Sequence, residues 1–265
     1  MFSAKVVIFL AAVALCYGAP SVKLSNKRLN IDGGTATAIE EYPFVASAQW
    51  CVLGVCEHVC GAVIVNENWV LTSGSCAEDA QKVAVGASNL HGKDKVTVKI
   101  AAKYVHPKYT DGLGPNDVAL LQLSEALTFN IRVQPAKLPT QGQEFNGTAV
   151  VVGYGSTLLP DFNNLKVSPD VTLISNDECN AAIKQLIPDD DSPVDDDSNV
   201  CTLNEKSNTC DGDVGGPLSQ DGTVIGIVTW YIDPCGTNGA PNVFTKLSNF
   251  ANWINQTITE NSQIE

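Results

Sequence analysis

The segment Gly212-Asp213-Val214-Gly215-Gly216-Pro217 stands just before an apolar stretch, Val224-Ile225-Gly226-Ile227-Val228. Glycines with a closing proline are typical of a turn, and a short β-branched run bounded by turn residues is typical of a buried strand. The same alternation of strand and turn signals continues along the chain from Ile31. Thr148-Ala149-Val150-Val151-Val152 is apolar throughout, whereas Lys95-Val96-Thr97-Val98-Lys99-Ile100 alternates as a half-buried strand does. The pattern predicts an all-β protein.

Helical signals are confined to two places. Asn176-Asp177-Glu178-Cys179 opens a short helix that Pro188 ends, and Ser248 is expected to cap a C-terminal helix in which Phe250 and Trp253 share one face. No internal repeat or heptad is visible. Roughly 235 residues remain after processing, enough to bury a large core without a partner, so we expect a monomer.

The N-terminus has the features of an export signal. Lys5 precedes the apolar run from Val6 to Leu15, and small residues follow. The run is too short to span a bilayer, and no later stretch is long and apolar enough. We expect residues 1–18 to be a cleaved signal peptide, residues 19–30 a short prosegment, and the mature protein to be secreted.

The nine cysteines and three histidines indicate which disulfides and metal sites the chain can form. Cys16 leaves with the signal, and the remaining eight suggest four disulfides in an oxidising compartment, with connectivity open at this point. No paired Cys-x-x-Cys spacing exists, and His58, His91 and His106 are scattered, so a zinc site is disfavoured. We expect no metal and no cofactor.

The charge is strongly acidic. The chain has 16 basic and 29 acidic residues, and all four basic residues before Ile31 are lost on processing, which leaves 12 against 29, or -17. This argues against nucleic acid or an anionic membrane and favours cationic partners. Six of the nine residues from Asp189 to Asp197 are aspartates. We interpret this segment as a mobile, solvated loop rather than a tight calcium site.

Several motifs, in order, resemble the chymotrypsin/trypsin family, the S1-type serine proteases. They are Ile31-Asp32-Gly33-Gly34, Gly61-Ala62-Val63-Ile64, Trp69-Val70-Leu71-Thr72, Asn116-Asp117-Val118-Ala119-Leu120-Leu121, Gly226-Ile227-Val228-Thr229-Trp230 and Pro241-Asn242-Val243-Phe244-Thr245-Lys246. The resemblance implies two six-stranded antiparallel β-barrels with a short C-terminal helix, linked near Leu127 to Pro139, with the site between them. The domain is expected to span residues 31–258, followed by a tail at 259–265.

Two of the three catalytic positions that the resemblance implies carry other residues. The general base is replaced by Ser75, the nucleophile is replaced by Val214, and Asp117 alone remains. A valine has no hydroxyl to attack a carbonyl, and a serine is far too weak a base near neutral pH. The backbone amides of Gly212 and Val214 match the oxyanion-hole donors and are expected to survive as scaffold.

The resemblance also implies a closed specificity pocket. Its positions are Asn208, Thr229, Trp230, Tyr231 and Asn242. Asn208 is neutral where trypsins have an aspartate. Tyr231 and Asn242 stand at wall positions that the family leaves as glycine, so their side chains are expected to fill the space. Ala87 stands where members with a calcium loop place a glutamate, so that site is expected to be lost too.

Further residues follow from the same resemblance. The implied disulfides join Cys60 with Cys76, Cys179 with Cys201 and Cys210 with Cys235, which leaves Cys51 with Cys56 in a small hairpin. Asp213, held in family zymogens by a histidine and a serine, is expected to pair with His58, supported by Ser47, and to raise the pKa of that histidine. Asp32 makes insertion of Ile31 beside Asp213 look unfavourable. Asn146 and Asn255 are in glycosylation signals.

Three functions remain open. The first is a secreted, non-catalytic protease homologue that acts by binding another protein, as cofactor, decoy or recognition protein. The second is a hydrolase with residual or relocated chemistry, for which Thr209, Ser73 and Ser75 are the nearby hydroxyls. The third is an inert acidic storage or matrix protein.

Overall fold

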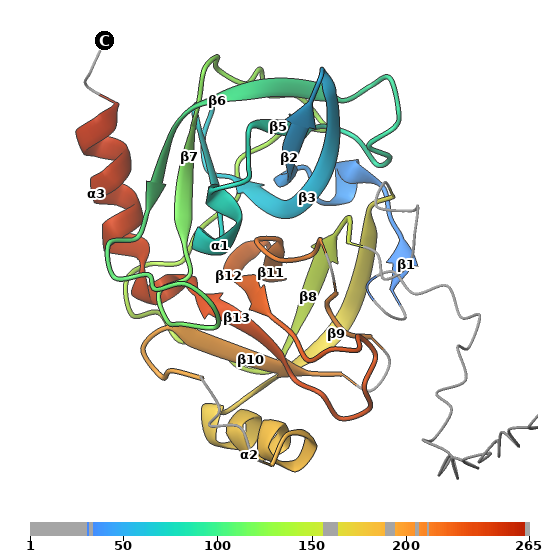
Figure 1. Ribbon diagram of the computed structural model, residues 1–265, viewed down its shortest axis with the longest axis vertical. Coiled ribbons are helices and arrows are strands. Elements are labelled where there is room, and N and C mark those ends of the chain that lie inside the picture. Colours follow the sequence, from blue (N-terminus) through green and yellow to red (C-terminus); the bar gives the residue numbers. More distant parts are fainter. Residues whose placement is uncertain are drawn as a thin grey trace, which may run out of the picture.

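The computed structural model describes residues 31, 34–155, 164–188, 194–204, 207–210 and 212–262. In this part the chain forms two β-barrels, one above the other in Figure 1, and ends in a helix. The expected signal peptide and prosegment lie outside the described residues, as do residues 189–193 of the acidic segment.

The first barrel is closed by six antiparallel strands in the order β2-β3-β4-β7-β6-β5. These are β2 (Val45–Val52), β3 (Val55–Ile64), β4 (Trp69–Thr72), β5 (Lys82–Val85), β6 (Val96–Val105) and β7 (Ala119–Leu123). Small and branched side chains such as Ala46, Ala62 and Leu121 fill its interior. Their alternation with outward-facing residues gives each strand one buried face.

The second barrel is formed by β8 (Thr148–Gly153), β9 (Lys166–Ile174), β10 (Asn199–Leu203), β11 (Pro217–Gln220), β12 (Thr223–Trp230) and β13 (Asn242–Lys246). Antiparallel pairing of β8 with β9 closes the order β9-β10-β13-β12-β11-β8, and the short β1 (Thr35–Ala36) adds to β9. Every residue of β12 is buried, as its uninterrupted apolar run predicts. The predicted architecture of two six-stranded antiparallel barrels is confirmed.

The described residues also form short helices outside the β-strands. They are α1 (Gly74–Ala77), α2 (Asn176–Leu186), α3 (Ala251–Asn261) and the 3-10 turns η1 (Ile39–Glu41) and η2 (Leu247–Asn249). Ser175 rather than Asn176 caps α2, through a capping box with Glu178. Ser248 lies in η2 and does not cap α3, which continues past the expected domain end at residue 258 to Asn261.

The helix α3 packs along the outside of the first barrel, beside β6 and β7 in Figure 1. Its N-cap residue Phe250 and its Trp253 and Ile254 belong to or pack against a cluster with Trp69 and Leu71. It therefore ties the C-terminus of the chain to the first barrel. None of the helices in the described part is long and apolar enough to cross a membrane.

Four disulfides are present, and they are the four expected pairs. They join Cys51 with Cys56, Cys60 with Cys76, Cys179 with Cys201 and Cys210 with Cys235. The Cys179–Cys201 bond fastens α2 to β10, and Cys60–Cys76 fastens α1 to β3. Such cross-linking is consistent with secretion into an oxidising compartment.

The two barrels approach each other closely at Gly61 and Gly216. A side chain on Gly61 would lie only 2.5 Å from the Cα of Gly216, so this position must lack a side chain. The backbone N–H of Gly61 donates to the carbonyl of Val214 at 2.8 Å. This contact joins β3 of the first barrel to the segment that precedes β11 of the second.

The β2–β3 hairpin extends beyond the first barrel. β2 pairs with β5 only through Ala46–Gln49, and β3 pairs with β4 only through Val63 and Ile64. The remaining ribbon is closed by the Cys51–Cys56 disulfide and by a turn in which both Leu53 (φ 50°) and Gly54 (φ 89°) have positive φ. This is a type I′ turn, which favours Asn-Gly. Leu53 is 100% exposed.

We expect the substitution Leu53→Asn to stabilise the protein. Leucine gains nothing from packing at this fully exposed position, and a left-handed conformation costs a residue with a bulky side chain about 1 kcal/mol more than it costs asparagine. The melting temperature should rise by about 1–4 °C in thermal denaturation. A fall in melting temperature would show that Leu53 makes a stabilising contact.

Candidate functional site

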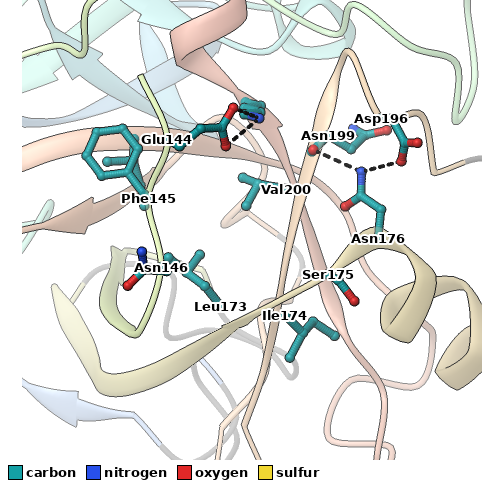
Figure 2. A pocket seen from close by; sticks show the side chains of 12 residues that line it. Glu144, Phe145, Asn146, Leu173, Ile174, Ser175, Asn176, Asp196, Asn199 and Val200 are labelled. Atoms are coloured by element: carbon teal, nitrogen blue, oxygen red, sulfur yellow. Dashed lines mark hydrogen bonds and ion pairs between the residues drawn. The ribbon is translucent and has the colours of Figure 1, made fainter. Parts of the chain in front are cut away.

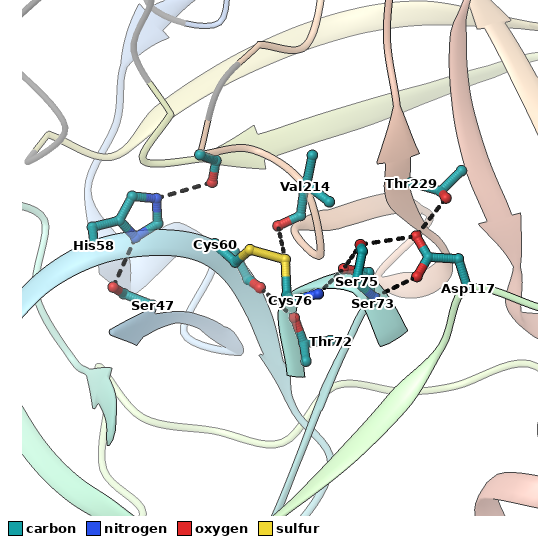
Figure 3. The surroundings of a disulfide bond; sticks show 12 residues. Ser47, His58, Cys60, Thr72, Ser73, Ser75, Cys76, Asp117, Val214 and Thr229 are labelled. Atoms are coloured by element: carbon teal, nitrogen blue, oxygen red, sulfur yellow. Dashed lines mark hydrogen bonds between the residues drawn. A yellow bond between two sulfur atoms is a disulfide. The ribbon is translucent and has the colours of Figure 1, made fainter. Parts of the chain in front are cut away.

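The site between the barrels is organised around the buried carboxylate of Asp117, which is 2% exposed and lies two residues before the start of β7. Its Oδ1 accepts from the backbone N–H of Ser75 at 2.8 Å, and its Oδ2 accepts from the Ser75 hydroxyl at 3.2 Å. The Thr229 hydroxyl, from β12 of the other barrel, donates to the same Oδ2 at 2.6 Å (Figure 3). One carboxylate thus links the two barrels.

Ser75 is held on the short helix α1. The Ser73 side chain caps this helix by accepting from the N–H of Cys76, and the hydroxyls of Ser73 and Ser75 lie 3.0 Å apart. The ring of Tyr109 lies against Gly74, where an added side chain would meet its Cδ1 at 2.9 Å. Burial, followed by the negative charge of Asp117, raises the pKa of Tyr109. The sequence analysis did not single out Tyr109.

Val214 follows a turn in which Gly212 has a φ of 82°. Its side chain is half-buried and packs against the core clusters of both barrels. Its carbonyl accepts the Gly61 N–H described above. Val214 therefore contributes apolar packing and one backbone acceptor to the junction between the barrels. The direction of the Gly212 and Val214 amides stays a prediction.

A second cluster of polar side chains lies beside Thr229 and Trp230 at the end of β12. The Oδ1 of Asn242, a residue 1% exposed, accepts from both the backbone N–H (2.7 Å) and the hydroxyl (2.9 Å) of Thr209. Its Nδ2 donates to Oδ1 of Asn208 at 3.5 Å. The Asn208 side chain in turn donates to the carbonyl of Thr237 at 3.3 Å. These side chains hydrogen-bond to one another. Tyr231, the other residue expected to fill the pocket, is half-buried.

His58 lies on β3 and is buried between the barrels. Its Nε2 is 2.9 Å from the carbonyl of Gly212 and its Nδ1 is 2.8 Å from the hydroxyl of Ser47. A carbonyl only accepts, so Nε2 carries the hydrogen and Nδ1 accepts from Ser47. Burial lowers the pKa of His58 to about 4, an effect that the bond to Gly212 only partly offsets.

With this geometry, the chain can be compared with known proteins. The model of the family described as Trypsin matches residues 31–254. The chain belongs to the trypsin family. Human kallikrein-7 is 34% identical over 203 residues, which cover 75% of this chain and 77% of kallikrein-7. Trypsin-1 of Astacus astacus is 34% identical over 244 residues, which cover 84% and 98% respectively.

A solved structure shows the same fold. Neuropsin, a serine protease expressed in the limbic system of mouse brain, superposes with a TM-score of 0.73 at 26% identity. The match covers 85% of this chain and 98% of neuropsin. The structure brings Ser75 and Asp117 into direct contact. That these two residues and Val214 stand at the catalytic positions of the family stays a prediction.

One expectation about the activation region of this trypsin-family chain is wrong. The pKa of His58 is lowered rather than raised, because desolvation of the imidazole dominates. His58 binds the carbonyl of Gly212, the residue before Asp213, and the expected supporting bond from Ser47 is present. The pairing of His58 with Asp213 itself stays a prediction.

The structure also places Ile31. Its side chain is 1% exposed and belongs to the core cluster of the second barrel. The unfavourable insertion of a freed Ile31 amine beside Asp213 stays a prediction. The described bonds of Asp213 come from the backbone N–H groups of Cys210 and Gly155, each at 3.0 Å.

Two peripheral predictions can be placed on the structure. In the described part of the acidic segment, Oδ1 of Asp195 accepts from the backbone N–H of Asp197, and the Asn176 side chain donates to Asp196, while the mobility of the loop stays a prediction. Among the described residues, no group of three or more His, Cys, Asp or Glu side chains could hold a metal ion. Asn146 and Asn255 are both exposed, as glycosylation requires.

We predict that Asp117→Asn stabilises the protein at pH 7. Burial raises the pKa of Asp117 even though Thr229 and Ser75 donate to it, so its charged form is disfavoured in the folded state. A raised carboxyl pKa supports stability below the unfolded value and loses that support as the pH rises. The asparagine carries no charge: its Oδ1 can accept from the Ser75 N–H, and its Nδ2 can donate to the Ser75 and Thr229 hydroxyls, which then act as acceptors.

The measurement is the melting temperature of the wild type and Asp117→Asn at pH 7 and at pH 4. The melting temperature of Asp117→Asn should exceed that of the wild type at pH 7. This difference should shrink at pH 4, where Asp117 of the wild type becomes protonated. Asp79→Asn, at an exposed position, is the matched control and should show no gain. A loss of stability at pH 7 in Asp117→Asn would mean that the charged hydrogen bonds outweigh desolvation.

The pKa of His58 predicts acid lability. Because the folded value, about 4, lies below the unfolded value, the unfolded state binds more protons between them, so stability falls as the pH drops through this window. The loss should approach about 3 kcal/mol. Chemical denaturation between pH 7 and pH 4 should give a shallower pH dependence for His58→Gln than for the wild type. His91→Gln, at an exposed position, should keep the wild-type slope.

Proposed function

We propose that the protein is a secreted, non-catalytic homologue of the trypsin family that acts by binding another protein. The proposal rests on the hydrogen bonds that Asp117 accepts. The carboxylate that would orient an imidazole accepts instead from the backbone N–H and the hydroxyl of Ser75. Val214 stands at the nucleophile position and packs against apolar core residues.

The chemistry of acyl transfer supports this reading. A serine protease needs a hydroxyl nucleophile, an adjacent imidazole to take its proton, and a carboxylate to orient the imidazole. Here only the carboxylate remains. In well-studied proteases, loss of the nucleophile or base alone lowers turnover about a million-fold.

The polar cluster around Asn242 argues against peptide binding at the specificity pocket. Its buried amide bonds to Thr209 and Asn208, so a substrate side chain would have to displace satisfied hydrogen bonds in a dry site. Asn208 also offers no charge to a Lys or Arg side chain. Catalysis and substrate recognition are therefore both disfavoured in this chain.

The exposed hairpin tip favours a binding protein over an inert one. Trp50, Val52 and Val55 are 45%, 43% and 64% exposed, next to the fully exposed Leu53. The Cys51–Cys56 disulfide holds this apolar tip in one shape. Rigid, exposed aromatic and aliphatic residues are typical of protein interaction sites. With a mature charge of -17, a cationic protein is the favoured partner, and nucleic acid or a membrane is not.

The alternatives stay distinguishable. A hydrolase with relocated chemistry would need a hydroxyl beside a base, yet the Thr209 hydroxyl is buried and donates to Asn242. An inert storage or matrix protein would bind no partner. The test is a pull-down in which the immobilised protein is exposed to the fluid of origin. A specific binder should capture a partner that the control variant Trp50→Ser plus Leu53→Asn does not capture, whereas an inert protein should capture none.

We predict that the purified protein neither hydrolyses activated esters and peptides nor reacts with an organophosphonate serine reagent. Val214→Ser and Ser75→His alone should remain inactive, because the catalytic groups act as a unit. The double variant should gain weak hydrolysis of small activated esters, while Arg and Lys peptides remain blocked at Asn242. Labelling is read by intact mass and hydrolysis by chromogenic substrates. Robust trypsin-like cleavage by the wild type would overturn the proposal.

A further inference from the structure

A cavity of about 370 Å³ opens at the end of the second barrel (Figure 2), and none of its lining residues belongs to the site around Asp117. Its apolar lining includes Ile225, which is 2% exposed, and the half-buried Phe145, Leu173 and Val200. All four belong to or pack against the core of this barrel. The cavity is therefore a place where the barrel core reaches the surface, and barrel mouths are frequent ligand sites.

The polar rim carries groups of both signs. Lys246 pairs with Glu144 at 2.9 Å on one side, and on the other Asn176 donates to Asp196 at 3.0 Å and to the carbonyl of Asn199 at 3.4 Å. A cationic ligand would meet Lys246, and an anionic ligand would meet two carboxylates on an acidic protein. A neutral molecule with many hydroxyls and an apolar face fits this lining best. Sugars have this chemistry.

One sugar acceptor lines the cavity itself. Asn146, exposed and labelled in Figure 2, begins the glycosylation signal Asn146-Gly147-Thr148. Its backbone is fixed at the cavity mouth: Gln220 donates to the carbonyl of Asn146 at 2.7 Å, and Leu173 donates to that of Gly147 at 2.8 Å. The neighbouring Phe145 presents an aromatic ring, whose negative face attracts the weakly positive C–H groups of a sugar ring.

We propose that Asn146 is glycosylated and that the first sugar residue of its glycan occupies this cavity, covering the exposed core of the second barrel. In the modification, Nδ2 of Asn146 bonds to the anomeric carbon of a lipid-diphosphate-linked oligosaccharide. The bond from that carbon to the phosphate oxygen breaks, the lipid diphosphate leaves, and the amide loses one proton to a base. The tether gives the sugar a high effective concentration at the cavity.

The second signal, Asn255-Gln256-Thr257, provides an internal control. Asn255 is exposed on α3, which packs on the first barrel, and is not part of the cavity lining. A glycan there would solubilise the protein without covering apolar residues of the barrel mouth. The inference does not depend on whether the protein is catalytic, because the cavity and the triad positions share no residue.

The test uses the full chain secreted from a eukaryotic cell line, with site occupancy measured by mass spectrometry. We expect Asn146→Gln to lower the melting temperature by about 2–4 °C, and Asn255→Gln by less than about 1 °C. Trimming the glycans to one sugar with an endoglycosidase should preserve the wild-type value, since the first sugar makes the contacts. Thr148→Val removes the same signal without altering Asn146 and should reproduce the shift.

A second arm links the effect to the cavity. In a Phe145→Ala background, removal of the Asn146 glycan should change the melting temperature by less than about 1 °C, because the stacking surface is gone. An unmodified Asn146 in the secreted protein would overturn the proposal. So would equal shifts for the two signals, or loss of the whole effect on trimming to one sugar. Each result leaves the proposed lack of catalysis untouched, because that is read by labelling.

Discussion

The carboxylate of Asp117 is the contact on which the arrangement of the two barrels depends. It is buried at the start of a strand of the first barrel, yet it accepts from Thr229 in the second barrel, and its own carbonyl accepts from Thr245. A buried carboxylate must be hydrogen-bonded to be tolerated. In this chain, Ser75 supplies the remaining donors. Donors from both barrels therefore hold this carboxylate at the junction.

Two further residues of this region fit the same principle. Val214 makes apolar contacts with both cores, and the Asn242 amide bonds to Thr209 and Asn208. A site whose polar groups satisfy one another is a stable part of a scaffold and a poor receptor for substrate.

Surfaces away from this junction then become the places where function can reside. The disulfide-closed hairpin presents Trp50 and Leu53 to solvent on a rigid support. The mouth of the second barrel presents an apolar floor beneath the acceptor Asn146. Both features lie on elements that the barrels hold in place, so each can bind without any rearrangement of the core.

From the sequence, the strand pattern predicted an all-β protein, and the resemblance to the trypsin family implied the two barrels and the four disulfide pairs, which cysteine spacing alone left open. Periodic apolar runs, turn residues and motif order are local signals that survive in a single chain, as in β6, β8 and β12. That Ser75 and Val214 stand at catalytic positions comes from the same resemblance and stays a prediction. Tertiary structure alone decided the state of His58, the burial of Ile31, the bonds around Asn242 and the cavity beside Asn146. These depend on desolvation and on the meeting of segments far apart in the chain, such as His58 with Gly212, and a sequence carries no direct record of either.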